Sequence, residues 1–268
     1  MTTLAPSPSL FSIKPLIVAA LHLPDLAVAR QTGMAALEDY VLTNAAVFGE
    51  AGIRSIMLQD MTRVPDAAAP DSVAVMAALG SLLRARFPDI ALGIIFRAHD
   101  ARAPLAVAHA VGASFVRLKV YVGGVMTAAG PRDGLGTVAR AYRHDLRRDD
   151  IAILADVHDR TSVPRSPEAD EDAAQWAVQL GADGLIVTGR SFPESLSRIR
   201  RTRESGVRRP ILIGGSVTAD NVVEALSVAD GAIVSTSLMR KATSPDDPLR
   251  WDIARARALM QRVGDSAL

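Results

Sequence analysis

Residues 151–158 read IAILADVH, a run of apolar and small residues that ends in a carboxylate and an imidazole. A run that is apolar on both faces is typical of a strand in a parallel sheet that helices cover. Similar short runs recur along the whole chain, separated by segments with helical spacing. The eight runs are 15–23, 53–60, 90–97, 115–121, 151–158, 184–189, 210–216 and 231–237.

The segments between these runs have apolar residues at intervals of three to four, as helices do. Several of them end on glycine just before the next run, for example AGI at 51–53 and LGADG at 180–184, as helix C-termini commonly do. Eight strands alternating with eight helices in about 250 residues fit a single-domain (β/α)₈ barrel. An open doubly wound sheet shows the same alternation with fewer strands. We therefore predict an α/β chain with a barrel over 13–268, after a disordered or extended segment at 1–12.

The composition limits the classes of partner. Lys and Arg total 30 and Asp and Glu total 29, so the net charge of +1 gives no electrostatic reason to expect nucleic acid or a membrane surface. The absence of cysteine excludes disulfides, thiolate nucleophiles and Cys-ligated metals. The opening residues lack a secretory signal, and no apolar run approaches a bilayer span. We expect a cytoplasmic protein that acts on a small molecule, and a homo-oligomer is compatible with the sequence.

Charged residues within the apolar runs are the first candidate site residues. Asp156 and His158 are two positions apart, as are Arg117 and Lys119 on the preceding run. Residues so spaced share one face of a strand, which in a barrel is the interior or its C-terminal mouth. One interpretation is a structural Asp–Arg pair, with His158 capping the next loop. The other is a catalytic site with Asp156 and His158 as an acid–base pair, and with Arg117 and Lys119 neutralising negative charge.

The ends of the last two runs predict an anion site. IGGSVTADN at 213–221 leads from the seventh run into a helix, and IVSTS at 233–237 ends the eighth. In many barrels these two loops bind phosphate through backbone N–H groups and hydroxyls. Tight turns after strands also favour glycine without any ligand. The candidate anion-binding residues are Gly214, Gly215, Ser216, Ser235 and Thr236.

Four more polar residues end other runs or follow them, and each fits either a ligand contact or a turn cap. They are His22, Asp60, Asp100 and Thr188. A metal site needs three convergent ligands, and no spacing here requires one, although His22, Asp60, Asp156 and His158 are of the right types. We therefore expect no cofactor, with a divalent metal as the lesser alternative.

Several motifs resemble the BtpA/SgcQ family from about residue 15 to 262. They are HLP at 22–24, GASFVR at 112–117, ADVH at 155–158, IVTG at 186–189, PILIG at 210–214 and ADGAIVST at 229–236. The resemblance implies a TIM barrel of the ribulose-phosphate-binding kind. Members include a factor in photosystem I biogenesis and proteins described as nucleosidases or sugar-metabolism enzymes. Matches at His22, Asp100, Arg117, Asp156, His158, Thr188 and Thr236 carry the family pattern into the mouth of the barrel.

The chain departs from the family pattern around the same mouth. Gln59-Asp60 stands where the family has Glu-Asn, and Lys119 stands where it has asparagine. The loop residues Thr127-Ala128-Ala129-Gly130 replace Thr-Asp-Gln-Gly, and Ser235 replaces a glycine. Family chemistry that depends on that glutamate or loop aspartate therefore does not transfer to this chain.

Together these features predict an enzyme acting on a small phosphorylated or anionic molecule, sugar-like or nucleoside-like, by acid–base chemistry. Glycosyl transfer or hydrolysis is favoured, since a carboxylate such as Asp156 or Asp60 can stabilise an oxocarbenium-like centre. One alternative is a Schiff-base lyase or aldolase that uses Lys119. The other is a non-catalytic assembly or biogenesis factor.

Overall fold

The eight predicted runs form the strands of one closed, parallel barrel. The computed structural model describes residues 8–26, 32–62, 64, 66–158, 161–165, 169–241 and 247–265. Around the barrel the strand order is β1-β11-β10-β9-β7-β4-β3-β2. The strands are β1 (Leu16–His22), β2 (Ser55–Asp60), β3 (Ala91–Phe96), β4 (Phe115–Leu118), β7 (Ala152–Asp156), β9 (Gly184–Val187), β10 (Ile211–Ile213) and β11 (Gly231–Val234).

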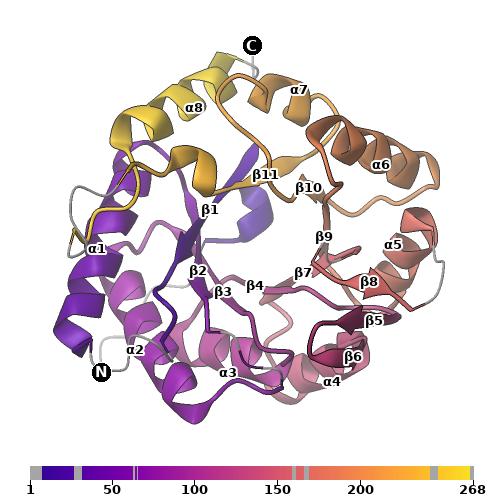
Figure 1. Ribbon diagram of the computed structural model, residues 1–268, viewed down its shortest axis with the longest axis horizontal. Coiled ribbons are helices and arrows are strands. Elements are labelled where there is room, and N and C mark those ends of the chain that lie inside the picture. The colour runs from indigo at the N-terminus through magenta and orange to yellow at the C-terminus, as the bar shows by residue number, and fades with distance from the viewer. Residues whose placement is uncertain are drawn as a thin grey trace.

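Helices follow the strands and form a ring outside them, so that the strands occupy the centre of Figure 1. Each strand is thus covered by helices, which explains why its residues are apolar on both faces. The prediction of a single-domain (β/α)₈ barrel is confirmed. The helices are α1 (Met34–Glu50), α2 (Pro70–Arg86), α3 (Arg102–Val111), α4 (Gly136–Asp145), α5 (Asp170–Gln179), α6 (Phe192–Glu204), α7 (Val222–Leu226) and α8 (Ile253–Asp265).

Alternate residues of each strand belong to two separate cores. Along β3, Ala91 and Ile95 pack inside the barrel, whereas Leu92 and Ile94 pack outward with the helices. Two residues from neighbouring strands, Phe115 and Leu154, also fill the interior. Inward-facing residues at the C-terminal ends of the strands therefore point to the C-terminal mouth.

The interior is closed at the N-terminal ends of the strands. Of the segment expected to be disordered or extended, residues 1–7 lie outside the described residues, but Leu10–Ser12 form a short 3₁₀ helix, η1. Leu10 is only 2% exposed and belongs to the interior core. The Ser114 hydroxyl, just before β4, donates to the Pro8 carbonyl at 2.8 Å. Part of this segment is thus ordered, because it covers the apolar floor of the barrel.

A small antiparallel sheet beside the mouth was not predicted. It has the order β6-β5-β8 and consists of β5 (Gly124–Thr127), β6 (Gly130–Asp133) and β8 (Val163–Pro164) (Figure 1). These strands have two to four residues and are rich in glycine and proline, so they lack the apolar runs that revealed the barrel. The β5–β6 hairpin is nevertheless important for the site, because it borders one of the cavities described below.

Between residues 8 and 265, none of the described helices is both long and apolar enough to cross a bilayer.

Candidate functional site

The C-terminal mouth of the barrel holds a cavity of about 540 Å³, called here the central pocket. Its walls come from strand ends that are far apart in sequence. The ends of β1, β3, β4 and β7 contribute side chains, and the loops that follow β10 and β11 complete the walls. The residues that define the central pocket are His22, Arg97, Arg117, Lys119, Asp156 and the loop stretches 214–218 and 235–237.

Arg117 and Asp156 form a two-pronged ion pair in this wall. The Nε and Nη2 atoms of Arg117 donate to the two carboxylate oxygens of Asp156 at 2.8 and 2.9 Å. The arginine side chain is 14% exposed and the aspartate side chain 5%. Such paired, charge-assisted hydrogen bonds fix the orientation of both groups. β4 and β7 are paired neighbours, so the inward residues at the ends of these strands meet as the sequence predicts.

His158 does not line the central pocket. Its Nε2 atom lies 3.5 Å from Oδ1 of Asp170, the first residue of α5. The imidazole borders a separate cavity of about 480 Å³, together with Arg190, Arg198 and Arg201. The prediction assumed that the strand continues through residue 158, but β7 ends at Asp156 and the alternation of faces ends with it. The structure therefore pairs Asp156 with Arg117 and pairs His158 with Asp170.

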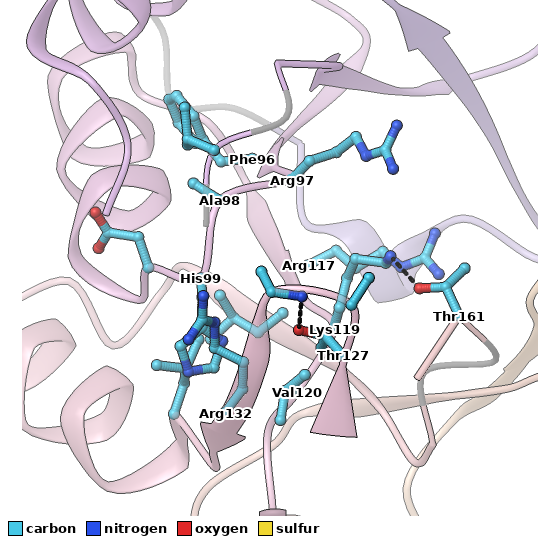
Figure 2. Close-up of a pocket in the computed structure, with 16 residues that line it drawn as sticks. Phe96, Arg97, Ala98, His99, Arg117, Lys119, Val120, Thr127, Arg132 and Thr161 are labelled. Atoms are coloured by element: carbon cyan, nitrogen blue, oxygen red, sulfur yellow. Dashed lines mark hydrogen bonds between the residues drawn. The ribbon is translucent and has the colours of Figure 1, made fainter. Parts of the chain in front are cut away.

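Two further cations point into the mouth beside Arg117. Arg97 continues the inward face of β3, two residues after Ile95. Lys119 follows β4, and its Nζ atom lies 3.4 Å from Oγ1 of Thr161. Figure 2 shows the charged ends of Arg97, Arg117 and Lys119 turned toward the same side as Thr161. The wall formed by β3 and β4 thus carries an excess of positive charge.

The imidazole of His22 lies close enough to Arg117 and Arg97 to be affected by their positive charge. Burial lowers the pKa of its imidazole, and the nearby charges of Arg117 and Arg97 lower it further. The ring packs edge-on against Trp251, with 6.3 Å between centroids. At neutral pH the imidazole is therefore largely neutral and able to accept a proton.

The loop after β10 has an uncommon backbone conformation. Thr188 Oγ1 donates to the Gly214 carbonyl at 3.1 Å, and a Cβ atom at position 214 would collide with that hydroxyl. Gly215 has φ of 121° and Ser216 has φ of 61°, both in the left-handed range. Among the described loops, the N–H groups of Gly215 and Ser216 take part in no backbone hydrogen bond.

The loop after β11 completes this side of the pocket. The Ser235 hydroxyl donates to the Ala20 carbonyl of β1 at 2.8 Å, and the Ser235 carbonyl accepts from Trp251 Nε1 at 3.2 Å. Ser235 therefore anchors the loop, while Thr236 begins the 3₁₀ helix η2 (Thr236–Leu238). Within the described part of the chain, the buried hydroxyl of Ser237 has no hydrogen-bond partner.

Asp60 and Asp100 support loops around the site. Asp60 is buried and accepts from the Thr62 N–H at 2.9 Å, and burial is the main cause that raises the pKa of its carboxyl group. The Asp100 carboxylate accepts from the N–H groups of Arg102 and Ala103 at the start of α3, and from that of Ala68. Asp60 does not border the central pocket. Asp100 lies at the edge of a neighbouring cavity that Phe96 and Ala98 also line and that is described below, and Asp60 does not border that cavity either.

No cluster of three His, Asp or Glu side chains suited to a metal ion occurs among the residues the structure describes. The residues of suitable type noted from the sequence separate in space. Asp60 bonds its own turn, Asp156 bonds Arg117, and His158 lies against Asp170.

Another cavity of about 480 Å³, distinct from the one beside His158 and called here the rim pocket, adjoins the central pocket. The two share Arg97, Arg117, Lys119 and Thr161. The remaining walls of the rim pocket are mostly apolar and include Phe96, Ala98, Leu118 and Val120 (Figure 2). The hairpin residues Ala128 and Ala129 border its outer side.

Sequence reasoning did not select several residues that line the central pocket. Arg97 is two positions from an inward-facing residue, so the spacing rule applied to β4 and β7 would have found it. Thr161 and Ser237 lie in loops beyond the strands, where no periodic pattern places them.

Comparison with known proteins gives one family over nearly the whole chain. The sequence model of the BtpA family matches residues 13–265. The photosystem I biogenesis protein BtpA of Synechocystis sp. is 27% identical over 244 residues, which cover 87% of this chain and 84% of that protein. An uncharacterized protein of Pyrococcus furiosus is 31% identical over 84% of this chain and 87% of its own length.

Solved structures with the same fold are more distant in sequence. A 3-hexulose-6-phosphate synthase superposes with a TM-score of 0.58 at 15% identity, covering 93% of this chain and 99% of its own. Phosphoribosyl anthranilate isomerase from Thermus thermophilus gives 0.54 at 12% identity, covering 93% and 98%. These likenesses establish the fold.

Proposed function

This chain belongs to the BtpA family, a family of TIM barrels of the ribulose-phosphate-binding type, and from that premise we propose that its central pocket binds a small phosphorylated molecule and carries out acid–base chemistry on it. The ligand is sugar-like or nucleoside-like. Structural neighbours whose names include a sugar phosphate support this class of ligand.

One observation carries the proposal, namely that three cationic side chains and the glycine- and hydroxyl-bearing loops after β10 and β11 line the same central pocket. The loops after β10 and β11 supply Gly215, Ser216 and Thr236, and the N–H groups of Gly215 and Ser216 take part in no backbone hydrogen bond among the described loops. Arg97 and Lys119 supply positive charge beyond the charge of Arg117 that Asp156 balances. A phosphate has several acceptor oxygens and a net negative charge, and it fits such a site.

Asp156 and His22 are the groups that we assign to the chemical step. In a glycosyl transfer or hydrolysis the bond between the anomeric carbon and its leaving group breaks, and positive charge develops on the sugar ring. The Asp156 carboxylate, oriented by Arg117, would stabilise that charge. The neutral His22 imidazole would accept the proton of the attacking hydroxyl or water as that oxygen bonds to the anomeric carbon, the role that the sequence suggested for His158. The leaving group would depart with the electron pair of the broken bond and take up that proton from His22.

Binding is tested by calorimetry with ribose 5-phosphate, inorganic phosphate and ribose. We expect both phosphate-bearing compounds to bind and ribose to bind at least about 10-fold more weakly than ribose 5-phosphate, because charge-assisted hydrogen bonds contribute about 1.5–3 kcal/mol each. Arg97→Ala should weaken ribose 5-phosphate by a similar factor. Arg208→Ala, which removes an exposed arginine outside the pocket, is the matched control and should have no effect.

Catalysis is tested with Asp156→Asn on a panel of phosphorylated glycosides, by following release of the leaving group. The variant should still bind ribose 5-phosphate and should lose bond cleavage by about 100-fold or more, since a stabilising charge in the transition state disappears. The proposal fails if neither phosphate-bearing compound binds at millimolar concentration, or if Arg97→Ala leaves their affinity unchanged.

A further inference from the structure

We propose that the phosphorylated ligand carries a ring-sized apolar group at the end opposite its phosphate, and that the rim pocket holds this group. The inference rests on the proposed function, because it extends the central pocket to a second compartment. It narrows the substrate class from any small sugar phosphate to a phosphate ester with an apolar ring.

The rim pocket exists because β3 and β4 separate toward the mouth. The parallel register of these strands pairs Gly93 with Phe115 and Ile94 with Val116, and among the described residues the two strands do not pair beyond that point. Beyond that point the segments 96–98 and 117–120 border a cavity. Their inward residues, Arg97, Arg117 and Lys119, line both pockets. The outward residues Phe96, Leu118 and Val120 line the rim pocket and not the central pocket.

The two compartments differ in chemistry, and this difference orients the ligand. In Figure 2 the charged ends of Arg97, Arg117 and Lys119 lie on the side of Thr161, whereas Phe96, Ala98 and Val120 lie on the other side. A phosphate is favoured among the cations and backbone N–H groups of the central pocket. An apolar group gains from leaving water among Phe96, Ala98, Leu118 and Val120.

The size of the site also indicates a ligand larger than a simple sugar phosphate. Each compartment, at about 480 and 540 Å³, lies within the range of about 300–1,000 Å³ found for whole small-molecule sites. A pentose phosphate placed at the loops after β10 and β11 leaves the rim pocket to be filled by another part of the molecule.

The polar edge of the rim pocket suits a ring with a hydrogen-bonding atom. His99 and Arg132 lie close together there (Figure 2), and burial and the Arg132 charge lower the pKa of the His99 imidazole. A neutral imidazole both donates and accepts hydrogen bonds. Aryl and heteroaryl rings are therefore both accommodated.

The test measures dissociation constants of the whole chain for ribose 5-phosphate, its 1-O-phenyl glycoside and adenosine 5′-monophosphate. Burial of a ring of this size should make the two ring-bearing compounds bind about 10- to 100-fold more tightly than ribose 5-phosphate. Ala98→Leu, which fills the rim pocket, should remove most of this gain and leave ribose 5-phosphate within about threefold of the wild type.

The matched control is Ala36→Leu on an exposed position of α1, which should change none of the three constants. Val120→Thr keeps the shape of the wall and adds a hydroxyl, so it tests the same point if the Ala98→Leu substitution perturbs folding. Equal binding of all three compounds, or a gain that survives both variants, would overturn the inference and leave the proposed function standing. If ribose 5-phosphate itself does not bind, the proposed function fails and the inference fails with it.

Discussion

Lys119 lies where the central and rim pockets meet, so its role decides which chemistry the site performs. Its ammonium group is 3.4 Å from the Thr161 hydroxyl and shares the mouth with Arg97 and Arg117. If it supplies only charge, Lys119→Arg should keep ribose 5-phosphate affinity within about threefold, and Lys119→Met should lower it about 10-fold. Calorimetry on the two variants measures this difference.

A Schiff-base role for Lys119 makes the opposite prediction. Arginine cannot form the imine, so Lys119→Arg would abolish turnover, and borohydride with a carbonyl substrate would attach a label to residue 119. Peptide mapping after such treatment identifies the labelled residue. Because Lys119 lines the same pocket as the cations Arg97 and Arg117, we expect the charge role and no label.

His22 and His99 should make the protein less stable in mild acid. The folded chain lowers the pKa of both imidazoles below 6.5, in each case chiefly by burial. Below pH 6.5 the unfolded chain therefore binds protons that the folded chain does not. The free energy of unfolding then falls as the pH drops, by at most about 1.4 kcal/mol per pH unit for each histidine, until the pH passes the lowered pKa.

Denaturant unfolding between pH 7.5 and 5 measures this slope. His22→Gln should flatten it, whereas His144→Gln, at an exposed position of α4, serves as the control and should leave it unchanged. An identical slope in the wild type and in His22→Gln would contradict the assignment of this effect to burial of His22.

The ends of β4 and β7 show how far strand periodicity can predict a site. Arg117 and Asp156 lie within their strands, and the structure brings them together as the spacing predicts. Lys119 lies one residue past the end of β4 and still faces the pocket. His158 lies two residues past the end of β7 and faces Asp170 instead. The rule is therefore reliable inside a strand and loses its physical basis within a residue or two of its end.

The interior of the barrel requires glycine at position 93 of β3. A Cβ atom there would overlap the Phe115 ring of β4. Gly93→Ala should lower the free energy of unfolding by about 1–3 kcal/mol through overpacking. In a cycle with Phe115→Leu the two effects should be non-additive by more than about 1 kcal/mol, since the smaller side chain makes room for the methyl group. Additive effects in urea unfolding would show that this clash is relieved elsewhere.

The short helix η1 contributes to stability although it lies outside the repeating pattern. Leu10 is 2% exposed and packs in the interior core. Leu10→Ala should cost about 2–5 kcal/mol, as deletion of buried leucine atoms usually does. Met126→Ala, at a position 46% exposed, is the control and should cost far less. Urea unfolding midpoints compare the two, and equal shifts would show that η1 does not close the core.

For the molecule as a whole, the barrel could be predicted from the sequence, whereas the small antiparallel sheet and η1 could not. All eight barrel strands produce apolar runs because helices cover them outside and side chains fill them inside. The small sheet of β5, β6 and β8 and the helix η1 are too short for their sequences to carry a periodic signal. The loops after β10 and β11 could be placed at the mouth because strand order fixes their position, and their role as an anion site stays a prediction. Thr161 and Ser237 depend on loop paths that local sequence does not specify.

Ligand binding should stabilise the entire fold, because the pocket walls come from strands on all sides of the barrel. At 100 times its dissociation constant, ribose 5-phosphate should raise the free energy of unfolding by about 2.7 kcal/mol. Urea unfolding with and without this compound measures the effect. Arg97→Ala should reduce it at the same ligand concentration, and an undiminished effect in that variant would place the binding site elsewhere.

The sealed floor beneath the barrel has a kinetic consequence. Because Leu10 packs under the interior core, substrate must reach Asp156 and product must leave it through the C-terminal mouth. A product must leave the mouth before the next substrate molecule can bind. A product that occupies the central pocket should therefore inhibit turnover at Asp156 competitively with respect to the substrate.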